Sequence, residues 1–106
     1  MKENSSSAIV IDETDNVGLA IRNLKAGENV TLIMGENKRT ITLRDDVLFM
    51  HKFAIKDIKI GEKITKYGQA VGTATSDIMT GQHVDTDNIK SLRGQFSKKR
   101  VPRKTE

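Results

Sequence analysis

Short stretches of alternating apolar and polar residues recur along the chain, and this period of two is typical of β-strands. Residues 30–34 and 39–43 show the pattern on either side of Gly35, Glu36 and Asn37, a combination that favours a turn. We therefore expect a β-hairpin there. Further short extended segments are expected at 8–11, 53–55, 63–67, 70–74 and 83–87.

One segment near the N-terminus has a helical period instead. Its apolar residues fall at i, i+3, i+4 and i+7, namely Val17, Ala20, Ile21 and Leu24. Asp15 is a favourable N-cap residue just before them, and Gly27 is placed to end the helix. The chain is therefore predicted to be mostly β with a minor α component, built from short strands, one N-terminal helix and irregular turn units.

A short motif occurs three times, at 22–31, 56–65 and 76–85. Each copy has Asn or Asp, then Leu or Ile, two variable residues, Gly, Glu or Gln, one variable residue, and Val or Ile. The Asn or Asp side chain can close a local turn on its own backbone, the aliphatic residue can anchor that turn, and Gly suits a positive φ. The unequal spacing of the copies excludes a solenoid and indicates one compact domain.

Composition sets limits on this domain. At 106 residues the chain has room for a single core, and with 36% hydrophobic residues and no Trp that core must be thin. Support from a larger partner or a homo-oligomer is therefore plausible. The absence of cysteine excludes disulfides, thiolate metal sites and thiol catalysis.

The net charge of +4 comes from the C-terminal end. Residues 93–106 hold six basic side chains and one acidic one, whereas the first 92 residues carry a net charge of −1. Because the body lacks a basic face with interleaved aromatic residues, we do not expect it to bind nucleic acid. The weaker alternative is that the basic tail binds RNA, DNA or acidic surfaces. No apolar run is longer than the four residues at 8–11, so neither a signal peptide nor a membrane span is expected, and the default localisation is cytoplasmic.

Two motifs point to a known family when they are taken together: His-Lys-x-Ala-x-x-Asp-Ile at 51–58 and Lys-Tyr-Gly-x-x-Val-Gly at 66–72. With the segment 12–30, which contains Asp-Asn-Val, they make residues 8–92 resemble the SAF-type β-clip domain of altronate and galactarate dehydratases. In some organisms this domain is a separate small subunit, as also in sulfolactate sulfo-lyase. The expected layout is a disordered N-terminus (1–7), the β-clip domain (8–92) and a flexible basic tail (93–106).

A candidate metal site lies in the third copy of the motif. His83, Asp85 and Asp87 alternate along the expected strand, so their side chains would project from one face about 6–7 Å apart. One imidazole and two carboxylates suit Mg²⁺, Mn²⁺ or Fe²⁺. The alternative is a solvated polar strand without a ligand. The family that the chain resembles usually has histidines where the two aspartates stand, which leaves specificity for altronate open.

The resemblance also implies roles for His51 and Lys52, which by composition alone would read as a surface pair. A sugar-acid dehydratase removes the proton alpha to the carboxylate and expels hydroxide from the next carbon. Lys52 could pair with the carboxylate, and His51 could move a proton or bind the metal, whose Lewis acidity would assist. Lys66, Tyr67 and Asn88 are the expected substrate contacts, although Tyr67 also suits a packed ring with its hydroxyl at the surface.

These features predict the small subunit, or a detached N-terminal domain, of an altronate-dehydratase-like carbon–oxygen lyase. It would act on a hydroxy acid and be inactive without a larger subunit, because a substrate pocket needs about 300 Å³ or more, a heavy demand on one thin domain. The alternative is a non-catalytic module of the same fold that binds carbohydrate or protein.

Overall fold

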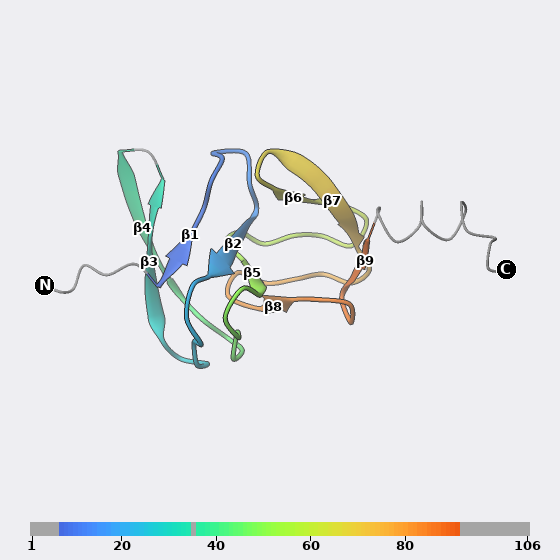
Figure 1. The fold of residues 1–106 in the computed structure, drawn as a ribbon. Helices are drawn as coiled ribbons and strands as arrows, with labels where there is room; N and C mark the ends of the chain where they lie inside the picture. Colours follow the sequence, from blue (N-terminus) through green and yellow to red (C-terminus); the bar gives the residue numbers. More distant parts are fainter. Residues whose placement is uncertain (1–6, 35, 92–106) are drawn as a thin grey trace, which may run out of the picture.

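The structure, a computed structural model, describes residues 7–34 and 36–91. Within them it contains strands and turns but no helix (Figure 1). The strands are β1 (Ala8–Ile9), β2 (Val17–Ala20), β3 (Asn29–Met34), β4 (Asn37–Thr42), β5 (Lys52–Ala54), β6 (Lys63–Lys66), β7 (Gln69–Ala74), β8 (His83–Val84) and β9 (Ile89–Ser91). The prediction of a mostly β domain with short strands is confirmed.

The strands form three small antiparallel sheets. The central sheet has the order β1-β2-β5-β8, and it lies between the β3–β4 hairpin and the sheet β6-β7-β9 (Figure 1). The hairpin expected around Gly35 to Asn37 is confirmed, with Val30 opposite Ile41 and Met34 opposite Asn37. The central sheet therefore connects two lobes, one formed by each outer sheet.

The predicted N-terminal helix is wrong. Val17 and Ala20 lie in strand β2, which pairs with β1 on one edge and β5 on the other, and all four of its residues are buried. In such a strand apolar side chains point to both faces, so the sequence shows no period of two. Gly18 is also a poor helix residue, and it suits this strand because a Cβ there would lie 3.1 Å from Cζ of Phe53.

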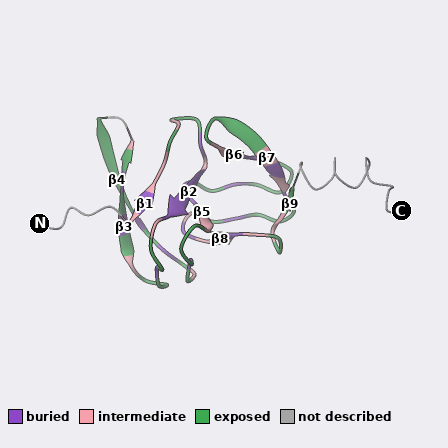
Figure 2. Ribbon diagram, viewed as in Figure 1, coloured by how far each residue is buried: buried purple, intermediate pink, exposed green. Residues whose placement is uncertain are grey.

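Most of the buried apolar side chains fall into two clusters, one for each lobe. Figure 2 shows where the buried residues lie along the ribbon. The larger cluster packs the β3–β4 hairpin against the central sheet and contains Ala8, Ala20, Leu24, Val30, Leu32, Ile41, Leu43, Val47, Phe53 and Ile55. The second cluster packs β6 and β7 against the opposite face of that sheet and contains Val17, Ala54, Ile58, Ile64, Ala74, Ile78 and Val84. Neither cluster contains a side chain larger than Phe53, which is consistent with the thin core expected from composition.

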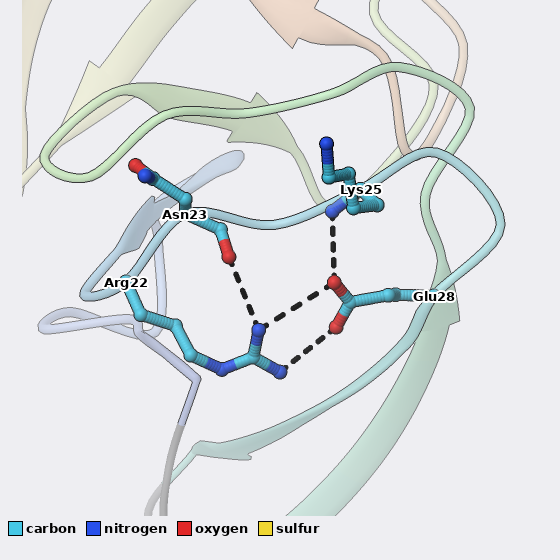
Figure 3. Close-up of polar contacts among 4 residues, drawn as sticks. All are labelled: Arg22, Asn23, Lys25 and Glu28. Atoms are coloured by element: carbon cyan, nitrogen blue, oxygen red, sulfur yellow. Dashed lines mark hydrogen bonds and ion pairs between the residues drawn. The ribbon is translucent and has the colours of Figure 1, made fainter.

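The repeated motif forms the same turn in all three places. Its glycine has a positive φ of 90° in Gly27 and Gly61 and of 94° in Gly81. The Glu or Gln that follows accepts a hydrogen bond from the backbone N–H three residues earlier, in the pairs Lys25–Glu28, Lys59–Glu62 and Met79–Gln82. Figure 3 shows the first copy, in which the Glu28 carboxylate also pairs with Arg22.

One more turn of this kind, at 45–51, escaped the sequence motif, so the chain has four such turns among its described residues and this one is the second in chain order. Asp46 and Val47 take its Asx and aliphatic positions, and Met50 takes the glycine position with a φ of 73°. The turns meet in pairs, because Leu24 bridges Val47 and Ile58 bridges Ile78. The chain thus contains two similar halves, each consisting of a turn, a hairpin and a second turn paired with the first.

The Asx side chains cap the paired turn, whereas the sequence analysis expected each of them to close its own. Four bonds of 2.8–2.9 Å run from the N–H groups of Phe49, Ala26, Thr80 and Ile60 to the side chains of Asn23, Asp46, Asp57 and Asp77, respectively. Each pair of turns exchanges two such bonds. The backbone N–H groups at the apex of one turn are therefore satisfied by side chains of the other turn. The predicted disordered N-terminus and basic tail fall, apart from Ser7, outside the described residues.

Candidate functional site

A pocket of about 780 Å³ is lined by both the central sheet and the sheet β6-β7-β9. It brings together four of the residues singled out from the sequence, namely Lys52, Lys66, Tyr67 and Asp85. Asp85 and Thr86 complete one wall, while Ala70, Val71 and Ile89 supply apolar surface. Two ammonium groups and one carboxylate around an apolar wall can hold a small anion that also carries hydroxyl groups.

Lys52 lies on β5 opposite Leu19 of β2 and Val84 of β8, and it is half-buried. Burial holds the pKa of Lys52 below its ordinary value, and the positive charge of Lys66 lowers this pKa further, whereas the carboxylate of Asp85 raises it. The two lysines therefore repel each other across the pocket. An anion bound between them would relieve that repulsion.

Tyr67 and Gly68 form the two-residue turn that joins β6 to β7. Both have a positive φ, 56° and 77°, as a type I′ hairpin turn requires. Tyr67 is 47% exposed, and Nζ of Lys66 lies 5.0 Å from the centre of its ring. The tyrosine therefore lies at the rim of the pocket with its face towards a lysine, so the hydroxyl is accessible to a ligand.

A buried carboxylate that the sequence analysis assigned to a helix cap holds this turn in place. Asp15 is 1% exposed, and its Oδ1 accepts a hydrogen bond of 2.8 Å from the N–H of Gly68. Asn16 adds two bonds to β6, donating from Nδ2 to the carbonyl of Lys63 and accepting at Oδ1 from the N–H of Thr65. The Asp-Asn pair therefore positions the rim of the pocket.

His51 and His83 meet at the junction of β5 and β8. Nδ1 of His51 lies 2.9 Å from Nε2 of His83, so one ring donates a hydrogen bond to the other, and the ring planes differ by 17°. Oδ2 of Asp85 is 3.9 Å from the same Nε2. One ligand atom from each of the three side chains falls within 4.8 Å of the other two. Asp85 also lines the pocket, so the group and the pocket adjoin.

Asp87 does not join this group. The strand predicted over 83–87 is wrong beyond Val84, where β8 ends, and the chain then turns so that the N–H of Asn88 donates to the carbonyl of Asp85. Asp87 therefore lies outside the strand, so the alternation of side chains along a strand does not place it on the same face as His83 and Asp85. Its side chain is exposed.

Asn88 holds the backbone of the group. Its Oδ1 accepts from the N–H of Asp85 at 2.9 Å, and its Nδ2 donates to the carbonyl of His83 at 2.8 Å. Asp45 adds a bond of 2.9 Å from the N–H of His83 to its Oδ2. No local pattern pointed to Asp45, because its partner is 38 residues away. The substrate contact expected of Asn88 stays a prediction, since its amide is engaged in this turn.

Comparison with known proteins yields a family and several relatives. The family model for the altronate/galactarate dehydratase SAF domain matches residues 6–92. Altronate dehydratase of Escherichia coli (strain K12) is 40% identical over 83 residues, and that of Bacillus subtilis (strain 168) is 36% identical over 85 residues. These matches cover 78% and 80% of this chain but only 16% of each relative.

A second kind of relative is nearly the length of the matched region. The (2R)-sulfolactate sulfo-lyase subunit alpha of Chromohalobacter salexigens is 31% identical over 88 residues, which cover 80% of this chain and 94% of that subunit. The part of the described structure that forms the sheets, turns and pocket falls within the matched residues. No helix capable of spanning a membrane is present among the described residues. The chain belongs to the altronate/galactarate dehydratase SAF domain family.

Proposed function

We propose that this chain is the small component of a lyase acting on a sugar acid or a related hydroxy acid, and that a larger subunit completes the active site. The observation that carries the proposal is the pocket with Lys52 and Lys66, in a chain related to altronate dehydratases and to a sulfo-lyase subunit. The chain spans only 16% of each altronate dehydratase, so most of such an enzyme would have to come from elsewhere.

The pocket has the chemistry that such substrates need. Lys52 and Lys66 offer two ammonium groups to a carboxylate. Asp85 can accept a hydrogen bond from a substrate hydroxyl, and the Tyr67 hydroxyl can donate one to a substrate hydroxyl. Its volume of about 780 Å³ is within the usual range for small-ligand pockets, so pocket volume, which the sequence analysis took as the reason for a larger subunit, does not by itself require one. Several of its walls are exposed, however, and proton abstraction from carbon is favoured where water is excluded. A second subunit that closes the pocket would provide this exclusion.

An apolar turn that closely precedes the pocket residue Lys52 in the chain is suited to receive that subunit. The apices of the first, third and fourth turns read Lys-Ala-Gly, Lys-Ile-Gly and Met-Thr-Gly, whereas the apex of the second turn is Leu48, Phe49 and Met50. These three residues, here called the apolar apex, are 54%, 56% and 54% exposed. They directly precede His51 and Lys52 in the chain. A large lyase subunit docked on the apolar apex would bury them and reach the edge of the pocket.

The test is reconstitution with a large subunit of the altronate-dehydratase type. The purified complex should convert a hydroxy acid to a keto acid, and neither component should do so alone. Lys52→Ala and Lys66→Ala should each raise KM at least about tenfold, because each removes a charge from the carboxylate site. Lys63→Ala is the matched control, since Lys63 is exposed on β6 but does not line the pocket.

Two results would contradict this proposal. Turnover by the isolated chain would remove the need for a larger subunit. Saturable binding of sugar acids without turnover in any complex would instead favour the non-catalytic binding module.

A further inference from the structure

We propose that His51, His83 and Asp85 form a metal site that binds a divalent ion and presents its open positions to the Lys52–Lys66 pocket. The ligand that this arrangement suits is a 2-hydroxycarboxylate, held as a chelate by its carboxylate and adjacent hydroxyl. The metal assignment rests on geometry alone, whereas the choice of ligand rests on the proposed function. The site differs from the one expected from the sequence, since His51 replaces Asp87.

The spacing of the two imidazoles suits a shared ion. Two nitrogens bound at about 2.1 Å and at right angles around one metal lie about 3.0 Å apart. Nδ1 of His51 and Nε2 of His83 are 2.9 Å apart. Both rings can present these nitrogens as neutral acceptors if the proton now shared between them moves to the far nitrogen of its own ring. The hydrogen bond thus holds the two nitrogens at nearly the separation that the ion requires, and each ring has to turn so that its lone pair points at the ion instead of at the other ring.

Asp85 can complete the set with a small movement. Its Oδ2 is 3.9 Å from Nε2 of His83, so a shift of about 1 Å would bring it to the separation of neighbouring ligands. The Asp85 side chain is 45% exposed and is therefore free to make this shift, whereas the His83 side chain is only 25% exposed. The ion would approach from the side of Asp85, which is also the side of the pocket.

The backbone that carries the ligands is fixed by hydrogen bonds that metal binding would leave intact. The N–H of His51 donates to the carbonyl of Leu48, and the carbonyl of His51 accepts from the N–H of Ala20, both at 2.9 Å. Asp45 and Asn88 fix the backbone of His83 and Asp85, as described above. Ligand positions that are ordered before the ion arrives lower the cost of binding it.

The donor set indicates which ions the site prefers. Two imidazoles and one carboxylate with free positions are typical of Fe²⁺ sites that also bind a substrate, and the same donors accept Mn²⁺, Co²⁺ or Zn²⁺. A 2-hydroxycarboxylate can occupy two neighbouring free positions. Its carboxylate would then lie near Lys52, whose charge interacts with that of Asp85 in the structure. Substrates with a carboxylate but no adjacent hydroxyl would bind more weakly.

The metal assignment is tested with the 106-residue chain alone and Co²⁺ as the probe. Titration calorimetry should show one site per chain, and Co²⁺ bound to nitrogen should give visible absorption. His51→Ala, His83→Ala and Asp85→Asn should each weaken Co²⁺ binding at least about tenfold, by loss of one of three ligands. Asp87→Asn, a change of the same kind outside the site, should leave the affinity unchanged.

Asp85→Asn keeps the shape of an exposed side chain, so it remains informative if a histidine variant does not fold. Equal affinity of wild type and Asp85→Asn, or no saturation of the wild type at about 1 mM Co²⁺, would overturn the assignment. Because these measurements need no larger subunit, they can fail while reconstituted turnover succeeds, and the proposed function would then stand without the metal.

The ligand class is tested on the Co²⁺-loaded chain with lactate and propionate, which differ only by the hydroxyl next to the carboxylate. Lactate should change the Co²⁺ absorption and raise Co²⁺ affinity, and propionate should do so less. Lys52→Ala should reduce the factor by which lactate raises Co²⁺ affinity, with each affinity compared with that of the same variant without lactate because the charge of Lys52 also acts on Asp85. Equal effects of the two acids would overturn the chelate and leave the metal site in place.

Discussion

Glu28, a single side chain in the first turn, combines two contacts that can be separated by substitution. Its Oε1 pairs with Arg22 at 2.8 Å, and its Oε2 accepts from the N–H of Lys25 at 2.8 Å (Figure 3). The hydrogen bond from Arg22 and then the one from Lys25 hold the pKa of Glu28 below its usual value of 4.5. Because the pKa is lower in the folded chain, the carboxylate stabilises the fold above pH 4.5 and loses that effect as the pH falls through the folded pKa.

Glu28→Gln should therefore cost stability only where the carboxylate is ionised. Gln82 makes the same turn bond to the N–H of Met79, so the amide should keep the bond to Lys25 and lose only the ion pair with Arg22. Since the pair is largely exposed, the expected loss at pH 7 is below about 1 kcal/mol. Urea unfolding should show this difference at pH 7 and show it shrink as the pH falls below 4.5 or in about 1 M salt. A difference that persists at low pH would mean that the turn bond itself is lost.

Gly27 and Gly81 provide a matched pair for separating backbone strain from steric conflict. Both have φ values of 90° or more, but a Cβ on Gly27 would meet nothing within 4 Å, whereas one on Gly81 would collide with the carbonyl oxygen of Thr42. Gly27→Ala should thus cost about 1–2 kcal/mol, the penalty for a left-handed residue. Gly81→Ala should cost clearly more, because the backbone must also move. Equal midpoints of thermal unfolding for the two variants would contradict this interpretation.

At the scale of elements, reciprocal capping predicts how the turn pairs respond to substitution. Asp77 accepts the N–H of Ile60 at 2.8 Å across the pair of turns. Asp77→Ala should destabilise the chain by about 1 kcal/mol, because this donor loses its partner. Asp77→Asn should cost less, since Asn23 caps Phe49 in the same way in the other pair. Urea unfolding of the three proteins would decide; an equal loss for Ala and Asn would show that the charge, and not the bond, is what matters.

These turns also mark how far the sequence could predict the structure. Local chemistry was sufficient for the β3–β4 hairpin and for the positive φ of Gly27, Gly61 and Gly81, because turns depend on a few neighbouring residues. It failed for strand β2, whose helical spacing is overridden by pairing with β1 and β5. The caps were also mispredicted, since a side chain that reaches a turn 17 to 26 residues away leaves no local pattern.

The candidate site shows the same division. Its residue types were predictable, and His51, His83 and Asp85 do come together. Whether His51 or Asp87 is the third member of the group could not be predicted, because this depends on the pairing of β5 with β8 and on the end of β8 at Val84. Lys52 and Lys66 likewise share a pocket only because the central sheet lies beside β6. Long-range strand pairing, and not spacing along the chain, selects the members of the site.

At the scale of the whole molecule, the two similar halves differ in what their turns expose. Leu48 of the second turn and Met79 of the fourth occupy equivalent positions and are 54% and 43% exposed. Only Leu48 belongs to the apolar apex beside the candidate site. Leu48→Ser should therefore weaken binding of the large subunit at least about fivefold, as expected for loss of a well-packed interface residue. Met79→Ser is the control, and equal weakening by both substitutions in a calorimetric titration would locate the interface elsewhere.

Met50 extends this argument because it combines strain with exposure. It is the non-glycine residue at the left-handed position of a turn whose three counterparts all have glycine, and its side chain is 54% exposed. A non-glycine residue in this conformation destabilises the fold by about 1–2 kcal/mol. Glycine removes that strain but loses more backbone entropy on folding, which costs about 0.5–1 kcal/mol. Met50→Gly should therefore leave the stability of the isolated chain unchanged or slightly higher. The same substitution should weaken binding of the large subunit, since it removes apolar surface from the apolar apex. Lower stability with unchanged binding would show that the methionine serves the fold; a more stable chain that binds less well would show that it serves the interface.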